Sequence, residues 1–152
     1  SIVIKKNNKI KLTIVGKGSE KQKLINLSKS LKIENKILFK GFSDPDLYYK
    51  KEGVFILNSY FEGLPNVLLE AIQYKIPIIS TNSFSGPAEI LKSGRYGYLV
   101  KVNDPKGLAK QIQKVLLNYS DALKKADKAH KSLHRFNIKT QCIKFDKIIK
   151  NL

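Results

Sequence analysis

The stretch at residues 58–81, NSYFEGLPNVLLEAIQYKIPIIST, constrains the fold more than any other part of the chain. The apolar run GVFILNS leads into it and is typical of a strand buried on both faces of a parallel sheet. Gly63 lets the chain turn, and Pro65 suits the first position of a helix because its missing N–H would have no partner there. A helix at 65–74 and a second buried strand, PIIST, follow. The apolar face expected for this helix consists of Val67, Leu68, Ala71 and Ile72.

Two glutamates flank the start of this predicted helix. Glu62 lies in the loop before it, and Glu70 lies at the edge of its apolar face. The helix start presents free N–H groups and the positive end of the helix dipole, which suits a diphosphate. Carboxylates on either side can accept hydrogen bonds from the hydroxyls of a ribose and of a sugar. In the plainer interpretation Glu62 begins a turn and Glu70 is a solvated helix residue, but the arrangement as a whole favours a site.

The stretch resembles the donor-binding half of retaining glycosyltransferases with the GT-B fold, and glycosyltransferase family 4 in particular. The resemblance rests on a serine, a short gap, Glu-Gly-x-Pro, four residues and Glu-Ala. These are followed by x-Pro-hydrophobic-hydrophobic-x-Thr and Gly-Pro-x-Glu-Ile, in one register from about Lys11 to Asp104. It implies an α/β fold: a Rossmann-like parallel sheet with helices on both faces, the C-terminal half of a GT-B enzyme.

The resemblance also implies roles for individual residues. Glu62 becomes a catalytic residue that binds sugar hydroxyls, and Glu70 binds the ribose of a UDP-, GDP- or ADP-sugar. The other donor-binding candidates are Gly16, Gly41, Phe42, Ser43, Gly63, Leu64, Pro65, Asn66 and Val67. Residues 41–43 correspond to contacts with the nucleotide base, with an ordinary strand end as an equal alternative. Gly16 lies in a Gly-x-Gly turn, and glycine is the usual solution to any tight turn between strand and helix.

The implied reaction moves a hexose, with retention, from a nucleotide sugar to a glycan or lipid-linked acceptor in cell-surface polysaccharide synthesis. No cofactor and no metal are expected, since the resemblance implies that the helix dipole and cations do the work of a metal in this fold. Complete members begin this domain with a strand carrying a phosphate-gripping Arg and Lys, and have an N-terminal acceptor domain. Neither is present, so residues 1–152 are predicted to form a single donor-binding domain, a fragment inactive alone.

Two other functions stay open at this point. A nucleotide-sugar epimerase has a related two-domain frame, although the spacing of Glu62 and Glu70 argues against it. A basic module for nucleic acid or an anionic surface would explain the net charge of +17. Nucleic-acid modules usually add arginine, and this chain has only Arg95 and Arg135. A solubilising lysine surface is therefore the first interpretation of the charge, contact with a membrane surface the second, and nucleic acid the last.

Composition points to a cytoplasmic protein, with peripheral contact to the inner face of the membrane as the second interpretation. No stretch approaches the ~20 apolar residues of a membrane helix, and no signal peptide precedes the first predicted strand. The single cysteine, Cys142, excludes an internal disulfide, fits a reducing compartment and is expected to be a small buried hydrophobe.

Strands alternate with helices along the chain, which predicts a mainly parallel sheet. The expected strands are 12–15, 37–40, 54–57, 78–80 and 98–100. A helix at 19–31, capped by Ser19, should turn Leu24, Leu27 and Leu31 inward, and Asp104 should cap another that runs to about residue 119. Residues 2–4 are expected to be the tail of a helix, or else a substitute strand. A final helix from Lys139 should bury Cys142, Ile143, Phe145, Ile148 and Ile149.

Overall fold

The structure, a computed structural model, describes residues 1–42, 44, 46–49 and 53–151. The chain divides into two compact units, Ser1–Lys51 and Glu52–Leu152, called unit 1 and unit 2 below. Each has its own hydrogen-bonded sheet, and every strand pair among the described residues is parallel. The predicted parallel α/β fold is confirmed, with two separate ladders.

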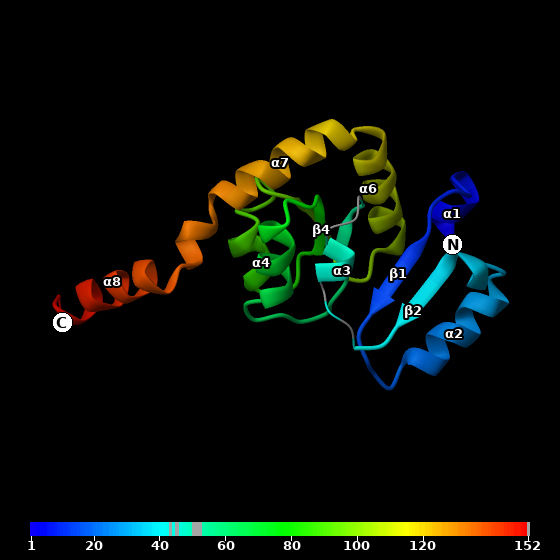
Figure 1. The fold of residues 1–152 in the computed structure, drawn as a ribbon, viewed down its shortest axis with the longest axis horizontal. Helices are drawn as coiled ribbons and strands as arrows, with labels where there is room; N and C mark the ends of the chain where they lie inside the picture. The colour runs from blue at the N-terminus through cyan, green and yellow to red at the C-terminus, as the bar shows by residue number, and fades with distance from the viewer. Residues whose placement is uncertain (43, 45, 50–52, 152) are drawn as a thin grey trace. The chain divides into compact units, whose positions relative to one another are not determined.

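Unit 1 has a two-stranded sheet, and Figure 1 shows one of its helices lying alongside this sheet. Its elements are α1 (Ile2–Lys6), β1 (Leu12–Val15), α2 (Lys21–Ser30), η1 (Glu34–Lys36), β2 (Ile37–Lys40) and α3 (Asp46–Tyr49). Both strands have their predicted bounds, and the segment at 2–4 is helical. Helix α2 begins two residues later than predicted, with Glu20 rather than Ser19 as its N-cap.

The three leucines of α2 were expected to face inward, and this prediction is wrong. Leu24, Leu27 and Leu31 are all exposed, and Ser28 is the residue of α2 that is buried. A two-stranded sheet has too little surface to cover a helix face that carries three leucines along its length. Of the described residues in unit 1, only Ser28 and Ile33 are buried.

Unit 2 has a three-stranded sheet in the order β3-β4-β5. Its elements are β3 (Phe55–Leu57), α4 (Asn66–Gln73), β4 (Ile78–Thr81), α5 (Gly86–Ile90), β5 (Tyr98–Val100), α6 (Pro105–Leu117), α7 (Tyr119–Lys131), η2 (Leu133–Phe136) and α8 (Ile138–Ile149). Figure 1 shows α4 and α6 on opposite sides of β4. The predicted helix at 65–74 is one residue shorter at each end.

The core of unit 2 surrounds β4, whose four residues are all buried. Because β4 pairs with a strand on each side and has helices over both faces, its successive residues can all be buried without alternation. On α4, Leu68, Ala71 and Ile72 are buried as predicted, whereas Val67 is exposed. The sheet therefore holds the start of α4 firmly at its carboxyl edge.

Two cations of the C-terminal half fix the chain between α5 and β5. The Lys125 ammonium donates to the Gly94 carbonyl oxygen at 2.7 Å and lies 4.6 Å from the centre of the Tyr98 ring. Burial, and secondarily the charges of Lys114 and Lys128, lower the pKa of Lys125. Arg135 donates from Nη2 to the Ile90 carbonyl oxygen at 2.8 Å, at the end of α5. These contacts tie α7 to the turn after α5 and to β5, and η2 to the last residue of α5.

Helix α8 does not bury its apolar side chains, so the predicted inward packing of Cys142, Ile143, Phe145, Ile148 and Ile149 is wrong. None of its residues is buried, and Cys142 is exposed. Ile138, Cys142, Phe145 and Ile149 are spaced four, three and four residues apart and share one face, the apolar stripe of α8. Figure 1 shows α8 reaching away from α4 and β4, so those elements cannot cover the stripe.

None of the helices in the described ranges combines the length and the apolarity needed to cross a membrane.

Candidate functional site

The loop from β3 to α4 carries most of the predicted site residues. Glu62 is partly buried, Gly63 and Leu64 are exposed, and Pro65 is buried. Pro65 is the N-cap of α4, with an extended backbone, rather than its first helical residue. The first hydrogen bond of the helix runs from the Leu68 N–H to the Pro65 carbonyl oxygen at 3.0 Å. The amides of Asn66 and Val67 precede it, and no side chain caps α4.

Thr81, at the end of β4, anchors the beginning of this loop. Its hydroxyl donates to the Ser59 carbonyl oxygen at 2.7 Å and accepts from the Ser59 N–H at 3.0 Å. Thr81 is the last residue of the x-Pro-hydrophobic-hydrophobic-x-Thr motif, but the sequence did not show that Ser59 would be its partner. The carboxyl ends of β3 and β4 are joined in this way.

A close contact between two glycines presses a second loop onto the first. A Cβ atom added to Gly86 would lie 1.6 Å from the Gly63 carbonyl oxygen and 2.8 Å from Cδ of Pro65. Ser85, just before it, has a positive φ of 65°. The Gly-Pro-x-Glu segment thus rests on the Glu-Gly-x-Pro loop, a packing role for Gly86 that the sequence analysis missed.

The chain bends at Gly63, as predicted, but the bend does not require a conformation special to glycine. The φ of Gly63 lies outside the left-handed region, and a Cβ atom there would have no neighbour within 4 Å.

Glu70 lies one turn into α4 and is partly buried. With Asn66, it lines a hollow of about 500 Å³ between the polar face of α4 and η2. Gln73, Leu133, His134 and Phe136 also line this hollow. Glu62 and Glu70 are therefore both partly shielded from water, one before and one after the first turn of α4.

The remaining predicted residues belong to unit 1. The Gly16 N–H donates to the Gly41 carbonyl oxygen at 3.2 Å, which joins the carboxyl ends of β1 and β2. Gly16 has a φ of 130°, a conformation that favours glycine. Phe42 is 88% exposed, and Ser43 lies outside the described residues. Their role as base contacts stays a prediction.

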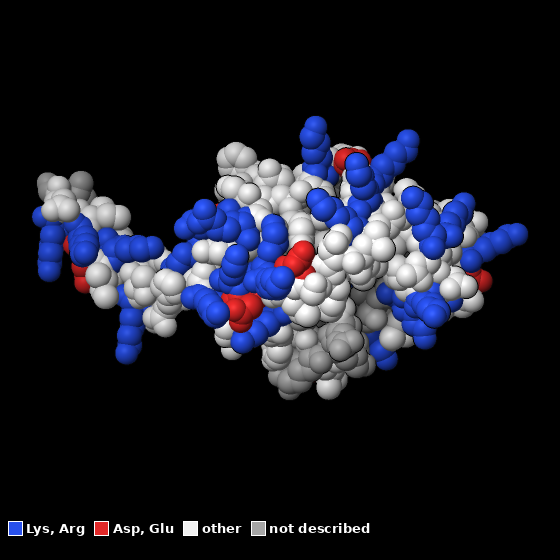
Figure 2. Space-filling view, turned by 90° about the horizontal axis from the view of Figure 1, so that it is seen from above, with Lys and Arg blue, Asp and Glu red and all other residues white. Residues whose placement is uncertain are grey.

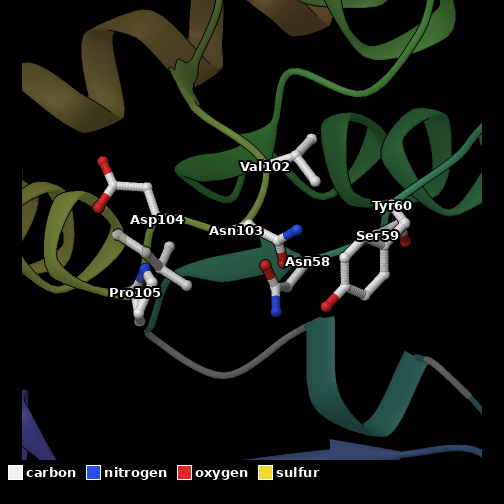
Figure 3. Close-up of a pocket in the computed structure, with 8 residues that line it drawn as sticks. Asn58, Ser59, Tyr60, Val102, Asn103, Asp104 and Pro105 are labelled. Atoms are coloured by element: carbon white, nitrogen blue, oxygen red, sulfur yellow. The ribbon is translucent and has the colours of Figure 1, made fainter.

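A second hollow, of about 510 Å³, lies beyond the ends of β3 and β5 (Figure 3). We call it the asparagine hollow. Its lining consists of Asn58, Ser59, Tyr60, Val102, Asn103, Asp104, Pro105 and Leu108. The sequence analysis did not identify it, because its two halves come from strands 43 residues apart in the chain. The available signal was an asparagine in the segment after each strand: Asn58 directly after β3 and Asn103 three residues beyond β5.

Within the described ranges, no group of three or more His, Cys, Asp or Glu side chains could hold a metal ion.

In unit 2 a parallel sheet carries a helix start between two carboxylates at its carboxyl edge, and α/β proteins in general bind ligands at that edge. Residues 1–132 match the family model described as glycosyl transferases group 1, and the chain belongs to this family.

Curated relatives agree with this family. A transferase of Campylobacter jejuni, N-acetylgalactosamine-N,N'-diacetylbacillosaminyl-diphospho-undecaprenol 4-alpha-N-acetylgalactosaminyltransferase, is 32% identical over 140 residues, 91% of this chain and 36% of that protein. The capsular polysaccharide biosynthesis glycosyltransferase CapM of Staphylococcus aureus is 31% identical over 118 residues, 76% of this chain and 30% of CapM. The chain thus spans about a third of the relatives it matches.

Solved structures show the same fold. TarM matches with a TM-score of 0.87 at 23% identity, over 96% of this chain and 30% of TarM. Anabaena Alr3699/HepE in complex with UDP matches with a TM-score of 0.81 at 21% identity, over 99% of this chain and 44% of that one. The fold is the α/β, Rossmann-like fold of GT-B glycosyltransferases, as the resemblance implied.

Proposed function

We propose that this chain is the donor-binding domain of a retaining glycosyltransferase that moves a hexose from a nucleotide diphosphate sugar to its acceptor. The observation that carries the proposal is the start of α4: two amides without a side-chain cap, set between the partly buried Glu62 and Glu70. The family match over residues 1–132 supports the same activity.

The start of α4 is suited to the diphosphate of the donor. The Asn66 and Val67 amides and the dipole of α4 stabilise negative charge there. Departure of the diphosphate leaves an oxocarbenium-like sugar and builds negative charge on the leaving group. Amides held in place by the packing of Gly86 on Gly63 can stabilise that charge with little rearrangement.

The two glutamates recognise hydroxyl groups in this proposal. Glu70 accepts hydrogen bonds from the ribose, and Glu62 accepts them from the sugar being transferred. Both carboxylates are partly buried. Partial burial strengthens a hydrogen bond to a charged group relative to one in open water.

The charge of the chain favours an anionic donor. Its formal net charge is +17, and Figure 2 shows lysine and arginine side chains spread over the visible face. Such a surface attracts a nucleotide diphosphate over distances of about a Debye length, roughly 8 Å at physiological salt.

The acceptor side of the proposal rests on the relatives. One relative's name refers to a diphospho-undecaprenol acceptor and another's to capsular polysaccharide. We propose a glycan or lipid-linked acceptor in polysaccharide synthesis, used on the cytoplasmic side of a membrane. Because the chain spans about a third of these relatives, we expect the 152 residues alone to bind a donor without transferring its sugar.

Calorimetric titration with UDP, GDP, ADP and their sugars tests the donor proposal. We expect one nucleotide to bind and Glu70→Gln to weaken its affinity tenfold or more, because a charged acceptor contributes on the order of 1.5–3 kcal/mol. The control is Glu34→Gln, an exposed glutamate of η1. Both variants remove one negative charge, which by itself would strengthen binding of an anion.

The variant Glu62→Gln distinguishes recognition of the sugar from recognition of the nucleotide. It should weaken binding of the nucleotide sugar and leave binding of the free nucleotide unchanged, whereas Glu70→Gln should weaken both. If the wild type and Glu70→Gln bind the nucleotide with equal affinity, the proposed contact between Glu70 and the ribose is wrong. No binding of any nucleotide by the folded chain would overturn the proposed function.

A further inference from the structure

Helix α6 carries a row of lysines that the donor proposal does not use. Lys106, Lys110 and Lys114 follow one another at intervals of four residues, and all three are exposed. Residues three or four apart lie on one face of a helix. Leu117, the last residue of α6, lies on the same face and is 84% exposed. We call these four residues the lysine row of α6.

The opposite face of α6 fixes the direction of this row. Val115 is buried in a cluster with Ile79 of β4 and Ala122 of α7. Leu108 and Ile112 pack against this cluster. The helix therefore cannot turn its lysines toward the core without exposing these apolar side chains. Since α6 follows β5 closely and lies on the side of β4 opposite α4, a flat surface can contact the row while the start of α4 stays open.

The lysine row concentrates positive charge. Helix α6 contains no aspartate or glutamate. On α7, by contrast, the ammonium groups of Lys124 and Lys131 lie 2.9 and 2.7 Å from aspartates of their own helix. The charge of Lys114 is also one of the causes that lower the pKa of the Lys125 ammonium. Like charges four residues apart on a helix repel one another, and an anionic partner would relieve that repulsion.

The residue types of α6 favour the headgroups of anionic lipids as this partner. A lysine ammonium is a compact charge that attracts phosphate groups without requiring one fixed geometry. An exposed leucine on the same face can enter the boundary between headgroups and acyl chains. Recognition of nucleic acid usually adds arginine and exposed aromatic side chains, and α6 contains neither.

We propose that the lysine row of α6 docks this chain on the surface of an anionic lipid bilayer, with Leu117 inserted among the headgroups. This inference rests on the proposed function and deepens it, because it names the surface that would hold the enzyme beside a lipid-linked acceptor. It assigns no acceptor site to this chain. Each lysine close to an anionic surface strengthens binding about fivefold, and the attraction extends over about a Debye length, roughly 8 Å at physiological salt.

Co-sedimentation of the 152-residue chain with lipid vesicles tests the docking surface. Vesicles of equal parts phosphatidylglycerol and phosphatidylcholine are the anionic probe, and vesicles of phosphatidylcholine alone are the neutral probe. We expect the chain to bind the anionic vesicles and not the neutral ones. Added salt should weaken this binding steeply, because it screens the attraction between exposed charges.

Two triple variants of equal net charge locate the contact. The α6 variant is Lys106→Gln/Lys110→Gln/Lys114→Gln, and the control is Lys139→Gln/Lys144→Gln/Lys147→Gln, at three exposed lysines of α8. The α6 variant should weaken binding to anionic vesicles on the order of 100-fold, and the control by less than about fivefold. A general attraction between the basic chain and the vesicles would weaken equally in both.

A single substitution tests the insertion of Leu117. Leu117→Gln keeps the length of the side chain and removes its apolar end, so it should weaken vesicle binding about three- to tenfold. Leu27→Gln, at an exposed position of α2, is the matched control and should leave binding unchanged. Circular dichroism should show the same helical signal for both variants as for the wild type.

Three results would overturn the docking surface: no binding to anionic vesicles, equal losses in the two triple variants, or tighter binding to a DNA duplex than to the vesicles at the same salt. The nucleotide titration described above reports separately on the donor proposal. Nucleotide binding without vesicle binding leaves the donor proposal standing and removes the docking surface. Vesicle binding through the lysine row without nucleotide binding removes the donor proposal and leaves a lipid-binding surface.

Discussion

Thr81 joins two strands through its side chain. Its hydroxyl contacts both backbone polar groups of Ser59, which lies two residues beyond the end of β3. Ser59 thus finds its partners outside the β3–β4 ladder, whose register ends at Leu57 and Ser80. A single hydroxyl therefore extends the sheet at the point where the loop carrying Glu62 begins.

Replacing this hydroxyl should destabilise the fold. Thr81→Val keeps the shape of the side chain but withdraws a donor and an acceptor from Ser59. We expect the free energy of unfolding to fall by about 1–3 kcal/mol, measured by urea denaturation. Thr13→Val, at an exposed position of β1, should change it by less than about 0.5 kcal/mol. Similar losses for both would mean that the Ser59 contacts contribute nothing beyond strand propensity.

At the level of residues, local patterns were easier to predict than partners. Helical periodicity predicted that Leu68, Ala71 and Ile72 would be buried, and they are. The partner of Thr81, and the fact that Asn58 and Asn103 line one hollow, depend on the order of the strands in the sheet, and no local pattern records that order. Whether Glu62 and Glu70 bind a donor stays a prediction.

The loops before α4 and α5 form one packed element through the contact of Gly86 with Gly63. The 1.6 Å clash of a Cβ atom is with a backbone oxygen, which cannot swing aside as a flexible side chain would. Any residue with a Cβ atom at position 86 must therefore push the two loops apart. The start of α4 would move with them.

Replacing each of the two glycines with alanine separates two effects on the free energy of unfolding. One is the steric clash of a new Cβ atom, and the other is the loss of backbone flexibility. Gly86→Ala should lower the free energy of unfolding by about 1–3 kcal/mol or more, as overpacking does. Gly63→Ala meets nothing within 4 Å and has no left-handed φ, so its effect should stay within about 1 kcal/mol. Chemical denaturation of the two variants provides the comparison. A loss at position 63 as large as that at position 86 would contradict the contact.

Strand positions were predicted well even where the strands are largely exposed, as β1 and β2 are. Strands β1, β2 and β5 have the predicted bounds, and the predicted cap of α6 by Asp104 is confirmed by its hydrogen bond to Gly107. The inward faces of α2 and α8 were wrong. Periodicity shows that a helix has an apolar face, but burial requires a neighbouring element, and that is a property of the fold rather than of the segment.

Burial is uneven over the whole molecule. In unit 2 every residue of β4 is buried, whereas unit 1 buries only Ser28 and Ile33 among its described residues. Its two-stranded sheet keeps Leu12, Val15 and Leu38 exposed. Because buried apolar area supplies most of the stability of a fold, the two units should differ in local stability.

Native-state hydrogen exchange should reveal this difference. We expect the amides of the β1–β2 ladder to exchange through openings that cost at least about 2 kcal/mol less than those of β4, roughly 30-fold less protection. The amides of β4 serve as the internal reference. Equal protection in both sheets would show that the chain opens as a single cooperative unit.

The thiol of Cys142 is the only one in the chain, and it lies on the apolar stripe of α8 where water can reach it. The native protein therefore has one reactive thiol for chemical labelling. A maleimide or Ellman's reagent should modify one group per chain as completely before denaturation as after it, and oxidation should link chains in pairs. A polarity-sensitive fluorophore attached to Cys142 would change its emission wavelength when the apolar stripe of α8 becomes buried.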